Sequence, residues 1–453
     1  MSFLLFVRNR FGLSDTKVKV FTNVFWAVLG KCYNLLGALV VGIVIARYLG
    51  PEQYGLMNYV ISYVAIFQVF ADFGLESIQI REEARNPSQR DVLIGTVLGL
   101  RLFFAVATLL LVSVVVFITE SDGLSRFYIL LYSISILFNT TWVFRHHFTS
   151  IVWNEYVVKT EIFRTTIGTA VKVLLLLLHA SLSWFIASLL FDSFLLASGY
   201  TTSYVKKIGS ITRFQFDKQL AWSLTKQSFP LLLSCAAIVM YTKIDQLMIG
   251  NMLSKAHLGI YAVAVQYSNV MVFVPTIIAQ TVSPILVQIR EESYVRYSLL
   301  SSQFMSITVW VCIIMACIVC MVSYPLVYFT FGSSYIYAAG ALSIISFKVI
   351  GDALSQTSGQ LMIIEGIQKF ASLRNMIGCI VCVLCNYVLI PRYGIMGTAC
   401  VSVLTVFSSG FLANLMIRSY RHIFLLQVTS LLKGWKSLIN LKTIFKNDHK
   451  IVS

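Results

Sequence analysis

Long runs of hydrophobic residues, separated by short polar stretches, dominate the sequence. A helix that crosses about 30 Å of hydrocarbon needs roughly 20 mostly apolar residues, and the pattern predicts twelve such helices. Their approximate ranges are 20–46, 54–73, 92–118, 127–144, 162–179, 184–204, 228–249, 259–285, 304–329, 337–363, 374–390 and 395–417. The polar connections are too short to fold as soluble domains, so we expect the protein to act within the membrane.

Composition agrees with this pattern. Of the 453 residues, 58% are hydrophobic and only 12% are charged, and the mean hydropathy is +0.80. These values are typical of an integral membrane protein. The first apolar run is longer than the hydrophobic part of a signal peptide, contains Lys31 and lacks a clear cleavage site, so we expect it to be retained as a membrane span.

The positions of lysine and arginine predict the orientation of the chain. With both termini in the cytoplasm, 25 of these residues fall in cytoplasmic segments and four fall in the outer connections. Cytoplasmic loops carry such an excess in membrane proteins. The net charge of +16 therefore indicates membrane orientation, and we expect no nucleic acid partner.

Two polar joints between apolar runs resemble each other. Aligning LGPEQYGLM at Leu49 with LSKAHLGIY at Leu253 places Gly55 on Gly259, an offset of 204 residues. Each joint follows the first run of a six-run block. Two blocks in the same orientation are typical of transporters. We therefore predict an N-terminal six-helix bundle over residues 1–210, a C-terminal bundle over 211–420, and a basic tail over 421–453.

The tail has two open interpretations. Leu425–Lys446 mixes apolar residues, including Trp435, with four lysines. This mixture fits a helix that lies on the cytoplasmic leaflet, and it also fits an unstructured basic tail.

Charged side chains within the apolar runs are candidate site residues, because each costs free energy there unless it is paired or hydrated. The cations are Lys31, Arg101, Lys172, Lys243 and Lys348, and the acids are Asp192, Asp245 and Asp352, with Asp72 and Glu76 at the inner end of the second run. Lys348 and Asp352 lie four residues apart on one helix face. Lys172 and Asp192 have similar expected depths on neighbouring helices. For these four residues, ion pairing and ligand contact are equal alternatives.

The other intramembrane cations have no partner within one helical turn. Lys243 and Asp245 are two residues apart and point in different directions. Lys31 and Arg101 have no acid nearby in sequence. Such cations predict a hydrated cavity that attracts an anion.

Motifs for catalysis are absent from the sequence. There is no Walker A loop, Rossmann glycine pattern, H-E-x-x-H or nucleophile elbow. The cysteines at 379, 382 and 385 are spaced like part of an iron–sulfur motif but lie in an apolar run and lack the fourth cysteine. We therefore expect no enzyme activity, no catalytic residues, no bound metal and no cofactor.

Three blocks of sequence carry a resemblance to a known family. They are ARYLGPEQYGLMNYV followed by FADFGLES, KIDQLMIGNMLSKAHLGIYAVA with VPTIIAQTVSPIL, and NYVLIPRYGIMGTACVSVL. The chain resembles bacterial polysaccharide-biosynthesis flippases of the multidrug/oligosaccharidyl-lipid/polysaccharide (MOP) exporter superfamily, with the closest likeness to O-antigen repeat-unit flippases of the Wzx type. The resemblance implies an all-α, MATE-like fold of two six-helix bundles around a central cavity.

The family resemblance also implies a function. Its members move undecaprenyl-pyrophosphate-linked oligosaccharides, as in lipopolysaccharide biosynthesis, from the cytoplasmic to the periplasmic face of the inner membrane by alternating access. In the implied fold the helices beside the two joints line the cavity. Together with the cost of burying charge, this makes Lys31, Lys243 and Asp245 the first candidates for substrate contact, followed by Arg101, Lys172, Lys348 and Asp352. Asp245 and Asp72 are the candidates for coupling to a proton or sodium gradient. Membrane lipid, a polysaccharide polymerase and a chain-length regulator are the expected partners.

Two other functions fit the sequence less well. A drug or small-cation exporter of the same fold should have an acidic or aromatic cavity, whereas cations outnumber acids within these runs. A membrane polysaccharide polymerase or glycosyltransferase should have a large aqueous face, whereas the outer connections here are short.

Overall fold

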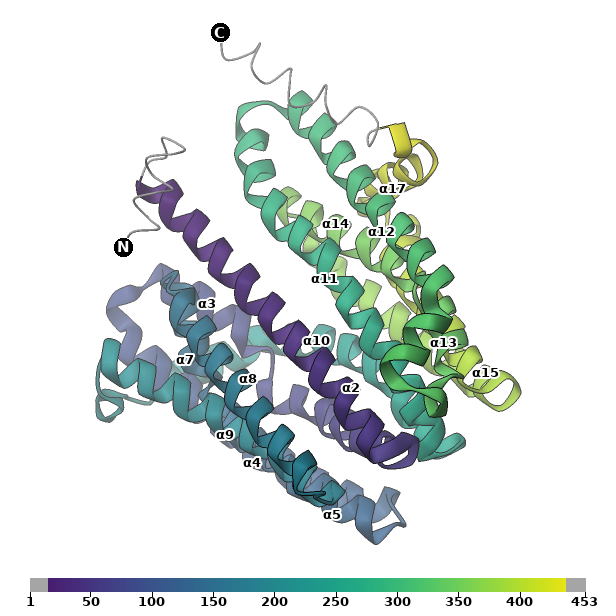
Figure 1. Ribbon diagram of the computed structural model, residues 1–453. Helices are drawn as coiled ribbons and strands as arrows, with labels where there is room; N and C mark the ends of the chain where they lie inside the picture. Colours follow the sequence, from purple (N-terminus) through teal and green to yellow (C-terminus); the bar gives the residue numbers. More distant parts are fainter. Residues whose placement is uncertain (1–14, 437–453) are drawn as a thin grey trace. The chain divides into compact units, whose positions relative to one another are not determined.

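The computed structural model of the protein describes the backbone of residues 15–436 and the side chains of residues 29–436 (Figure 1). All regular structure in this part of the chain is helical. The first long helices are α2 (Asp15–Asp72), α3 (Leu75–Arg85), α4 (Arg90–Thr119), α5 (Gly123–Ser133), α6 (Ser135–Phe138), α7 (Trp142–Ser150), α8 (Asn154–Leu177) and α9 (Leu182–Lys207). They are followed by α10 (Lys218–Met252), α11 (Lys255–Glu292), α12 (Tyr294–Phe331), α13 (Ala338–Ile345), α14 (Lys348–Glu365), α15 (Ala371–Phe407), α16 (Ala413–Met416) and α17 (Arg421–Lys433).

Nine helical stretches in the described residues are long and apolar enough to cross a membrane. Two of them, Leu29–Arg85 and Gln368–Met416, contain 57 and 49 residues, each more than twice the roughly 20 that one crossing needs. Each contains a break in helical geometry, at Gly50 (φ 71°, ψ 172°) and at Gly394 (φ 56°, ψ −138°). The described chain is therefore a multi-pass membrane protein, while the number of twelve crossings stays a prediction.

Glycine is needed at the first of these breaks. Gly50 has a positive φ, which side chains with a Cβ rarely adopt, and Pro51 follows it and cannot donate the hydrogen bond of a continuing helix. The predicted turn between the first two apolar runs is thus present at the predicted residues.

Two helices extend further than the apolar pattern predicts. The run 127–144 continues through α7 to Ser150, and the run 162–179 begins eight residues earlier, at Asn154. The early turns of α8 are polar, and they are stabilised by an ion pair between Lys159 and Glu155 at 2.5 Å. Hydropathy alone misses such turns because they add no apolar residues.

The described residues form two compact units. Unit 1 contains residues up to Leu49 and Tyr59–Ala236, and unit 2 contains Gly50–Asn58 and the residues from Ala237 onward. The boundary falls inside α10, so the first half of that helix packs with unit 1. Arg81 of α3, for example, donates a hydrogen bond of 2.5 Å to Gln227 of α10. The division of the transporter halves at residue 210 stays a prediction.

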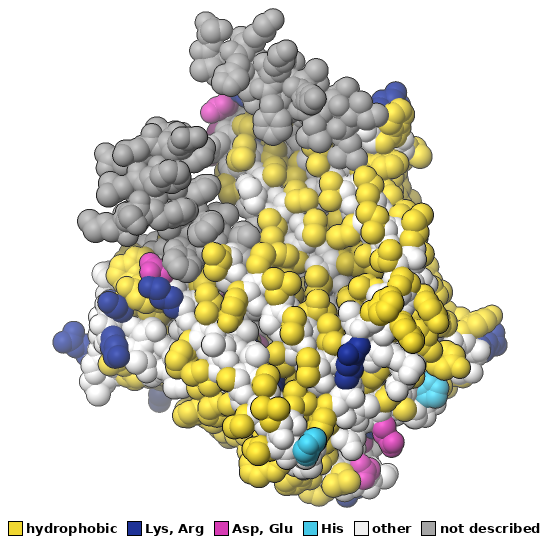
Figure 2. All heavy atoms as spheres, in the orientation of Figure 1, with side chains coloured by type: hydrophobic (Ala, Val, Ile, Leu, Met, Phe, Trp, Pro, Cys, Tyr) yellow, Lys and Arg dark blue, Asp and Glu magenta, His cyan; other side chains and the backbone are white. Residues whose placement is uncertain are grey.

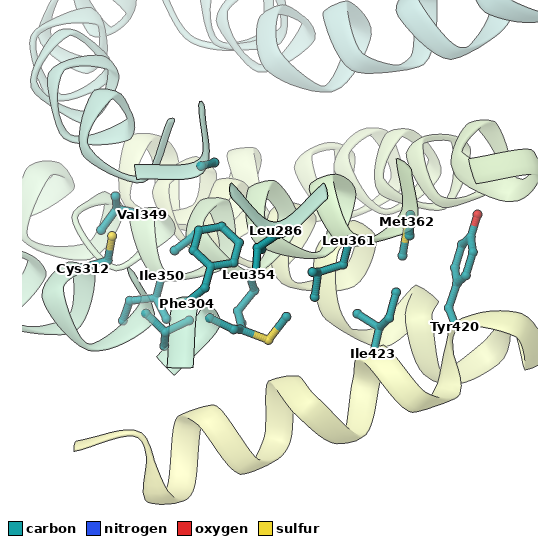
Figure 3. Packing of buried hydrophobic residues seen from close by; sticks show 14 of the residues in the cluster. Leu286, Phe304, Cys312, Val349, Ile350, Leu354, Leu361, Met362, Tyr420 and Ile423 are labelled. Carbon is teal, nitrogen blue, oxygen red and sulfur yellow. The ribbon is translucent and has the colours of Figure 1, made fainter. Parts of the chain in front are cut away.

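Each unit has its own hydrophobic core. In unit 1, buried side chains of α3, α4, α7 and α9 pack together, among them Leu75, Val97, Phe144 and Tyr204. In unit 2, the core is formed by α11, α12, α14 and α17, and Figure 3 shows it from close by.

The C-terminal helix α17 belongs to the core of unit 2. Ile423 is fully buried there, and Figure 3 shows it on the side of α17 that faces Leu361. Gln427 is also buried and donates hydrogen bonds to the carbonyl oxygens of Leu354 (3.1 Å) and Gly410 (2.8 Å). The first part of the predicted tail segment is therefore a packed helix, and its residues after Lys436 lie outside the described part.

Much of the surface is apolar. Hydrophobic side chains cover most of the face that Figure 2 shows. Large side chains with more than half of their surface exposed include Phe103, Leu110, Phe117, Met321 and Phe329. Such a surface is expected where lipid, rather than water, surrounds the helices.

Candidate functional site

Unit 1 contains a cluster of charged side chains around Arg101. This residue, on α4, is 2% exposed, and its guanidinium lies 3.4 Å from the carboxylate of Asp72 on α2. It also lies 3.5 Å from Nδ1 of His146 on α7. The prediction of an unpaired cation is wrong for Arg101, because its partner comes from the preceding membrane helix, 29 residues earlier.

The cluster continues from His146 toward α8. His146 Nε2 lies 3.5 Å from Glu76, and Arg145 lies 4.0 Å from Glu76 and 3.6 Å from Glu161. Glu161 accepts a hydrogen bond of 3.3 Å from Tyr200. Glu76 is 55% exposed and Arg145 is 35% exposed, so this end of the cluster reaches the surface of unit 1.

Lys31 lies on the same side of unit 1. It is exposed, and Glu161 and Arg145 are its charged neighbours. Asn34, one turn further along α2, donates a hydrogen bond of 3.0 Å to Glu161. The unit 1 cluster therefore consists of Lys31, Asp72, Glu76, Arg101, Arg145, His146 and Glu161. It combines three cations with three carboxylates, so these six charges balance.

Lys172 and Asp192 form an ion pair. For these residues the sequence left ion pairing and ligand contact as equal alternatives. Lys172 on α8 donates a hydrogen bond to Asp192 on α9, and both residues are buried. Gly168 makes room for the carboxylate, because a Cβ there would overlap the Oδ1 atom of Asp192. The pair therefore joins two helices of unit 1.

Unit 2 contains a second polar site around Asp245. This residue of α10 is 5% exposed. It accepts hydrogen bonds from the hydroxyl of Tyr261 on α11 (2.7 Å) and from the hydroxyl of Ser402 on α15 (3.4 Å). Tyr261 and Ser402 are also 2.8 Å apart. Three helices of unit 2 thus meet at one carboxylate.

A small cavity opens beside Asp245. Its volume is about 50 Å³, and Tyr261, Asn269, Lys348 and Ser402 contribute polar groups to its wall. A single water molecule needs roughly 10–15 Å³ of such volume. The cavity can therefore hold water or a small ion, but it has no room for a sugar.

The remaining predicted cations of unit 2 differ from each other. Lys348 donates a hydrogen bond of 2.8 Å to Asp352 one turn further along α14, which is the predicted helical pair. Lys243 is partly exposed, and within the described residues it forms no hydrogen bond or ion pair, with Asp245 as its charged neighbour. It is the predicted site residue that most resembles an unpaired cation.

The two joints that the sequence aligns contact each other within unit 2. A Cβ at Gly55 would overlap the carbonyl oxygen of Lys255 and lie 2.8 Å from the backbone nitrogen of Gly259. A Cβ at Gly259 would overlap the carbonyl oxygen of Pro51 and lie 3.0 Å from the nitrogen of Gly55. The offset of 204 relates Gly55 to Gly259 and Pro51 to Lys255, so the two contacts are equivalent and the backbones touch through corresponding positions.

The sequence of the chain matches the model of a known protein family. The family model for polysaccharide biosynthesis proteins matches residues 20–290, which is more than half of the chain. The chain belongs to this family. A search of curated protein sequences finds no match.

Solved structures with the same fold as this polysaccharide biosynthesis protein are transporters. The lipid II flippase MurJ, in an inward closed conformation, has a TM-score of 0.72 at 14% identity, covering 94% of this chain and 99% of MurJ. An inward-facing multidrug resistance MATE family transporter of the MOP superfamily has a TM-score of 0.61 at 14% identity, covering 88% and 96% of the two chains. These likenesses show the fold.

A third solved structure differs in its binding pocket. A MOP superfamily transporter from Pyrococcus furiosus, whose reversed pocket polarity suggests a different function, has a TM-score of 0.55 at 12% identity. The match covers 95% of this chain and 97% of that one. Pocket polarity therefore differs between proteins that share this fold, which makes the charges of each member informative.

Sequence reasoning about this polysaccharide biosynthesis protein missed two arginines inside helices. Arg145 was expected just after the run 127–144 and Arg374 at the cytoplasmic edge of the run 374–390, yet both lie within helices. Arg374 is 8% exposed and donates hydrogen bonds to Ser358 (3.2 Å) and to the sulfur of Met362 (3.7 Å), with no carboxylate partner among the described residues. Such an arginine could be found from the sequence by continuing the helical repeat of the neighbouring apolar run past its end. The search would then ask which polar residues fall on the same helix face as the apolar ones.

Proposed function

We propose that this protein is a flippase for undecaprenyl-pyrophosphate-linked oligosaccharides, the O-antigen repeat unit or a related surface polysaccharide. It moves them from the cytoplasmic to the periplasmic face of the inner membrane. The observation that supports the proposal most directly is the family match over residues 20–290. Lys243 and Arg374, which have no carboxylate partner among the described residues, add to it, because the pyrophosphate of such a substrate is an anion.

The physical task explains why cations are needed. A pyrophosphate and several sugars cannot cross hydrocarbon unaided, whereas the polyprenyl chain is as apolar as the lipid around it. Protein groups that replace the water around the pyrophosphate lower this barrier. Alternating access then requires two states of the protein that expose the bound headgroup to different sides.

We assign the headgroup contacts to cations that are accessible or lack an acid partner. Lys243 and the buried Arg374 are the first choice in unit 2, and the exposed Lys31 is the first choice in unit 1. Arg101, Lys172, Lys348 and Asp352 rank lower, because their charges are matched by ion partners. Losing one member of a buried pair costs about 3–5 kcal/mol, so Lys172, whose partner Asp192 is also buried, serves the fold first.

Asp245 is the proposed site of ion coupling. Its cavity of about 50 Å³ suits a proton acceptor or a small cation rather than a sugar, and hydroxyl groups of Tyr261 and Ser402 surround the carboxylate. A proton or sodium ion bound there would change the charge of a site shared by three helices. Asp72 is the second candidate, although its pairing with Arg101 already satisfies its charge.

The decisive experiment measures transbilayer movement directly. Purified protein is reconstituted with a defined undecaprenyl-pyrophosphate-linked oligosaccharide, and appearance of the sugar on the far side is followed with an added glycosidase. Proton and sodium gradients are imposed separately. We expect movement that depends on the protein, and on one of the gradients. Protein-dependent movement of a small cationic drug, with none of the lipid-linked sugar, would instead support a small-molecule exporter.

A membrane polymerase or glycosyltransferase predicts a different product. Such an enzyme would join sugars when given the lipid-linked substrate, whereas a flippase leaves the molecule chemically unchanged. We expect the glycolipid recovered from the proteoliposomes to have its original mass. A longer glycan formed only with this protein would overturn the proposed function.

A further inference from the structure

A cationic groove lies between α8 and α9 of unit 1, and none of its lining residues belongs to the charged cluster described above. These helices run side by side (Figure 1), and the groove between them has a volume of about 440 Å³. That volume is within the range that molecules of drug size occupy in proteins. None of its residues contributes to the ion pairs of Arg101, Lys172 or Asp245.

Close packing of the two helices forms the floor of the groove. Gly199 of α9 faces Thr160 of α8, and a Cβ at Gly199 would lie 2.5 Å from Cγ2 of Thr160. Because no side chain fills this position, the backbones approach closely here and leave a channel above them. The groove is therefore built by the helix packing rather than by a loop.

Three lysines stand at one end of the groove. Lys159 comes from the start of α8, and Lys206 and Lys207 come from the end of α9, and all three are exposed. The Nζ atoms of Lys159 and Lys207 lie 5.9 and 5.6 Å from the ring centroid of Tyr156. Glu155 pairs with Lys159 at 2.5 Å, while Lys206 and Lys207 have no ion pair among the described residues. This end therefore keeps a net positive charge.

The other end of the groove is apolar. Phe163 lies one turn beyond Lys159 on α8, and its side chain is 54% exposed. Leu195 lies on α9 eleven residues before Lys206, about 16 Å away along a helix that rises 1.5 Å per residue. Ser198 and Thr202 lie between them on the wall. The groove thus changes from cationic to hydroxyl-lined to apolar along α8 and α9. Of these two helices, α9 is among the nine stretches that are long and apolar enough to cross a membrane.

We propose that this groove binds one anionic glycerophospholipid from the leaflet predicted to be cytoplasmic. The phosphate lies among Lys159, Lys206 and Lys207, and an acyl chain follows Phe163 and Leu195 toward the membrane interior. Basic pockets between membrane helices on the cytoplasmic side bind anionic headgroups in this way. The inference does not depend on the proposed transport function, because lipid binding is measured without transport.

The test compares lipids and variants of the full-length protein in detergent. Palmitoyl-oleoyl-phosphatidylglycerol, palmitoyl-oleoyl-phosphatidylcholine and inorganic phosphate are titrated separately. Bound lipid is counted by native mass spectrometry, and the midpoint of thermal unfolding is followed in parallel. The test variant is K159Q/K206Q/K207Q. The matched control is K218Q/K226Q/K369Q, which removes three exposed lysines from elsewhere on the predicted cytoplasmic side.

We expect wild-type protein to retain one phosphatidylglycerol molecule and to gain thermal stability from it, but not from phosphatidylcholine. A lysine near an anionic headgroup is worth about 1 kcal/mol, a factor of roughly five in affinity. The triple glutamine variant should therefore bind phosphatidylglycerol about a hundredfold more weakly. The control should bind it like wild type, and K159R/K206R/K207R should bind it nearly as well because the charge is kept.

Several results would overturn the inference. Equal binding by the test variant and wild type would mean that the lysines do not form the site. Equal loss in the control would mean that total charge alone attracts the lipid. Stabilisation by phosphatidylcholine to the same degree, or by inorganic phosphate alone, would remove the requirement for an anionic lipid.

Discussion

Replacing Gly55 or Gly259 with alanine should weaken the contact between the two joints. The added methyl group of Gly55→Ala would overlap the carbonyl oxygen of Lys255 and lie 2.7 Å from its carbon. Non-bonded heavy atoms prefer separations of about 3.5–4.0 Å, so the backbones must move apart by about 1–2 Å. Neither neighbour is the end of a flexible side chain that could turn away.

The magnitude follows from two opposing effects. Alanine is favoured over glycine inside a helix by about 0.5–1 kcal/mol, which by itself would stabilise the protein. Overpacking against rigid neighbours costs about 1–3 kcal/mol. The overpacking cost is the larger, and a net cost of about 1–2 kcal/mol reduces the population of the contacting state by a factor of roughly 5–30.

The assay measures this population. Spin labels at Glu52 and His257, which are both exposed, report the distance between the joints in a cysteine-free background. We expect the short-distance population to fall in Gly55→Ala and to fall equally in Gly259→Ala, because the two glycines make equivalent contacts. Gly123→Ala is the control, since nothing lies within 4 Å of a Cβ at that position. Alanine variants whose distance distributions match this control would refute the reasoning.

Three further predictions concern the charged residues. Lys31→Ala and Lys243→Ala should lose polysaccharide export at normal membrane abundance, while arginine at either position should retain much of it; full export by both alanine variants would contradict the headgroup role. Lys172→Ala should lower abundance by destabilising the fold by about 3–5 kcal/mol, and Lys172→Leu combined with Asp192→Leu should restore it, as western blots of membranes would show. Asp245→Asn should remove the dependence of transport on an ion gradient, and transport that still responds to both gradients would exclude Asp245 from coupling.

The positions of the apolar helices could be predicted closely from the sequence, with systematic errors at their polar ends. The turn at Gly50 and Pro51 was predicted because both residues restrict the backbone locally. The first turns of α8 were missed because their stability comes from the Glu155–Lys159 pair and from packing. Arg374 was placed at the edge of the run 374–390 rather than inside a helix, because a polar residue lowers the local hydropathy wherever its side chain points.

Charge pairs could be predicted only between residues one helical turn apart, or between residues of similar expected depth on helices that follow each other in the chain. Lys348 and Asp352 are one turn apart, so helical geometry alone predicts their contact. The partner of Arg101 was not predicted, because Asp72 was interpreted as the inner end of a span rather than as a residue at the depth of Arg101. Whether two residues on different helices meet depends on how deep each helix sits in the membrane and how it is rotated about its axis. Hydropathy along a single sequence gives neither of these quantities.

The sequence by itself determined the membrane class, the approximate spans and the correspondence between Gly55 and Gly259. These properties depend on the hydropathy of residues that are close in sequence. A helix needs roughly 20 apolar residues to cross hydrocarbon, whatever it packs against. Only the tertiary structure decided that Arg101 is neutralised, that Asp245 lies beside a cavity of about 50 Å³ and that Gly199 opens a groove between α8 and α9. These properties depend on side chains from different helices meeting in space, and helix packing, not hydropathy, sets which of them meet.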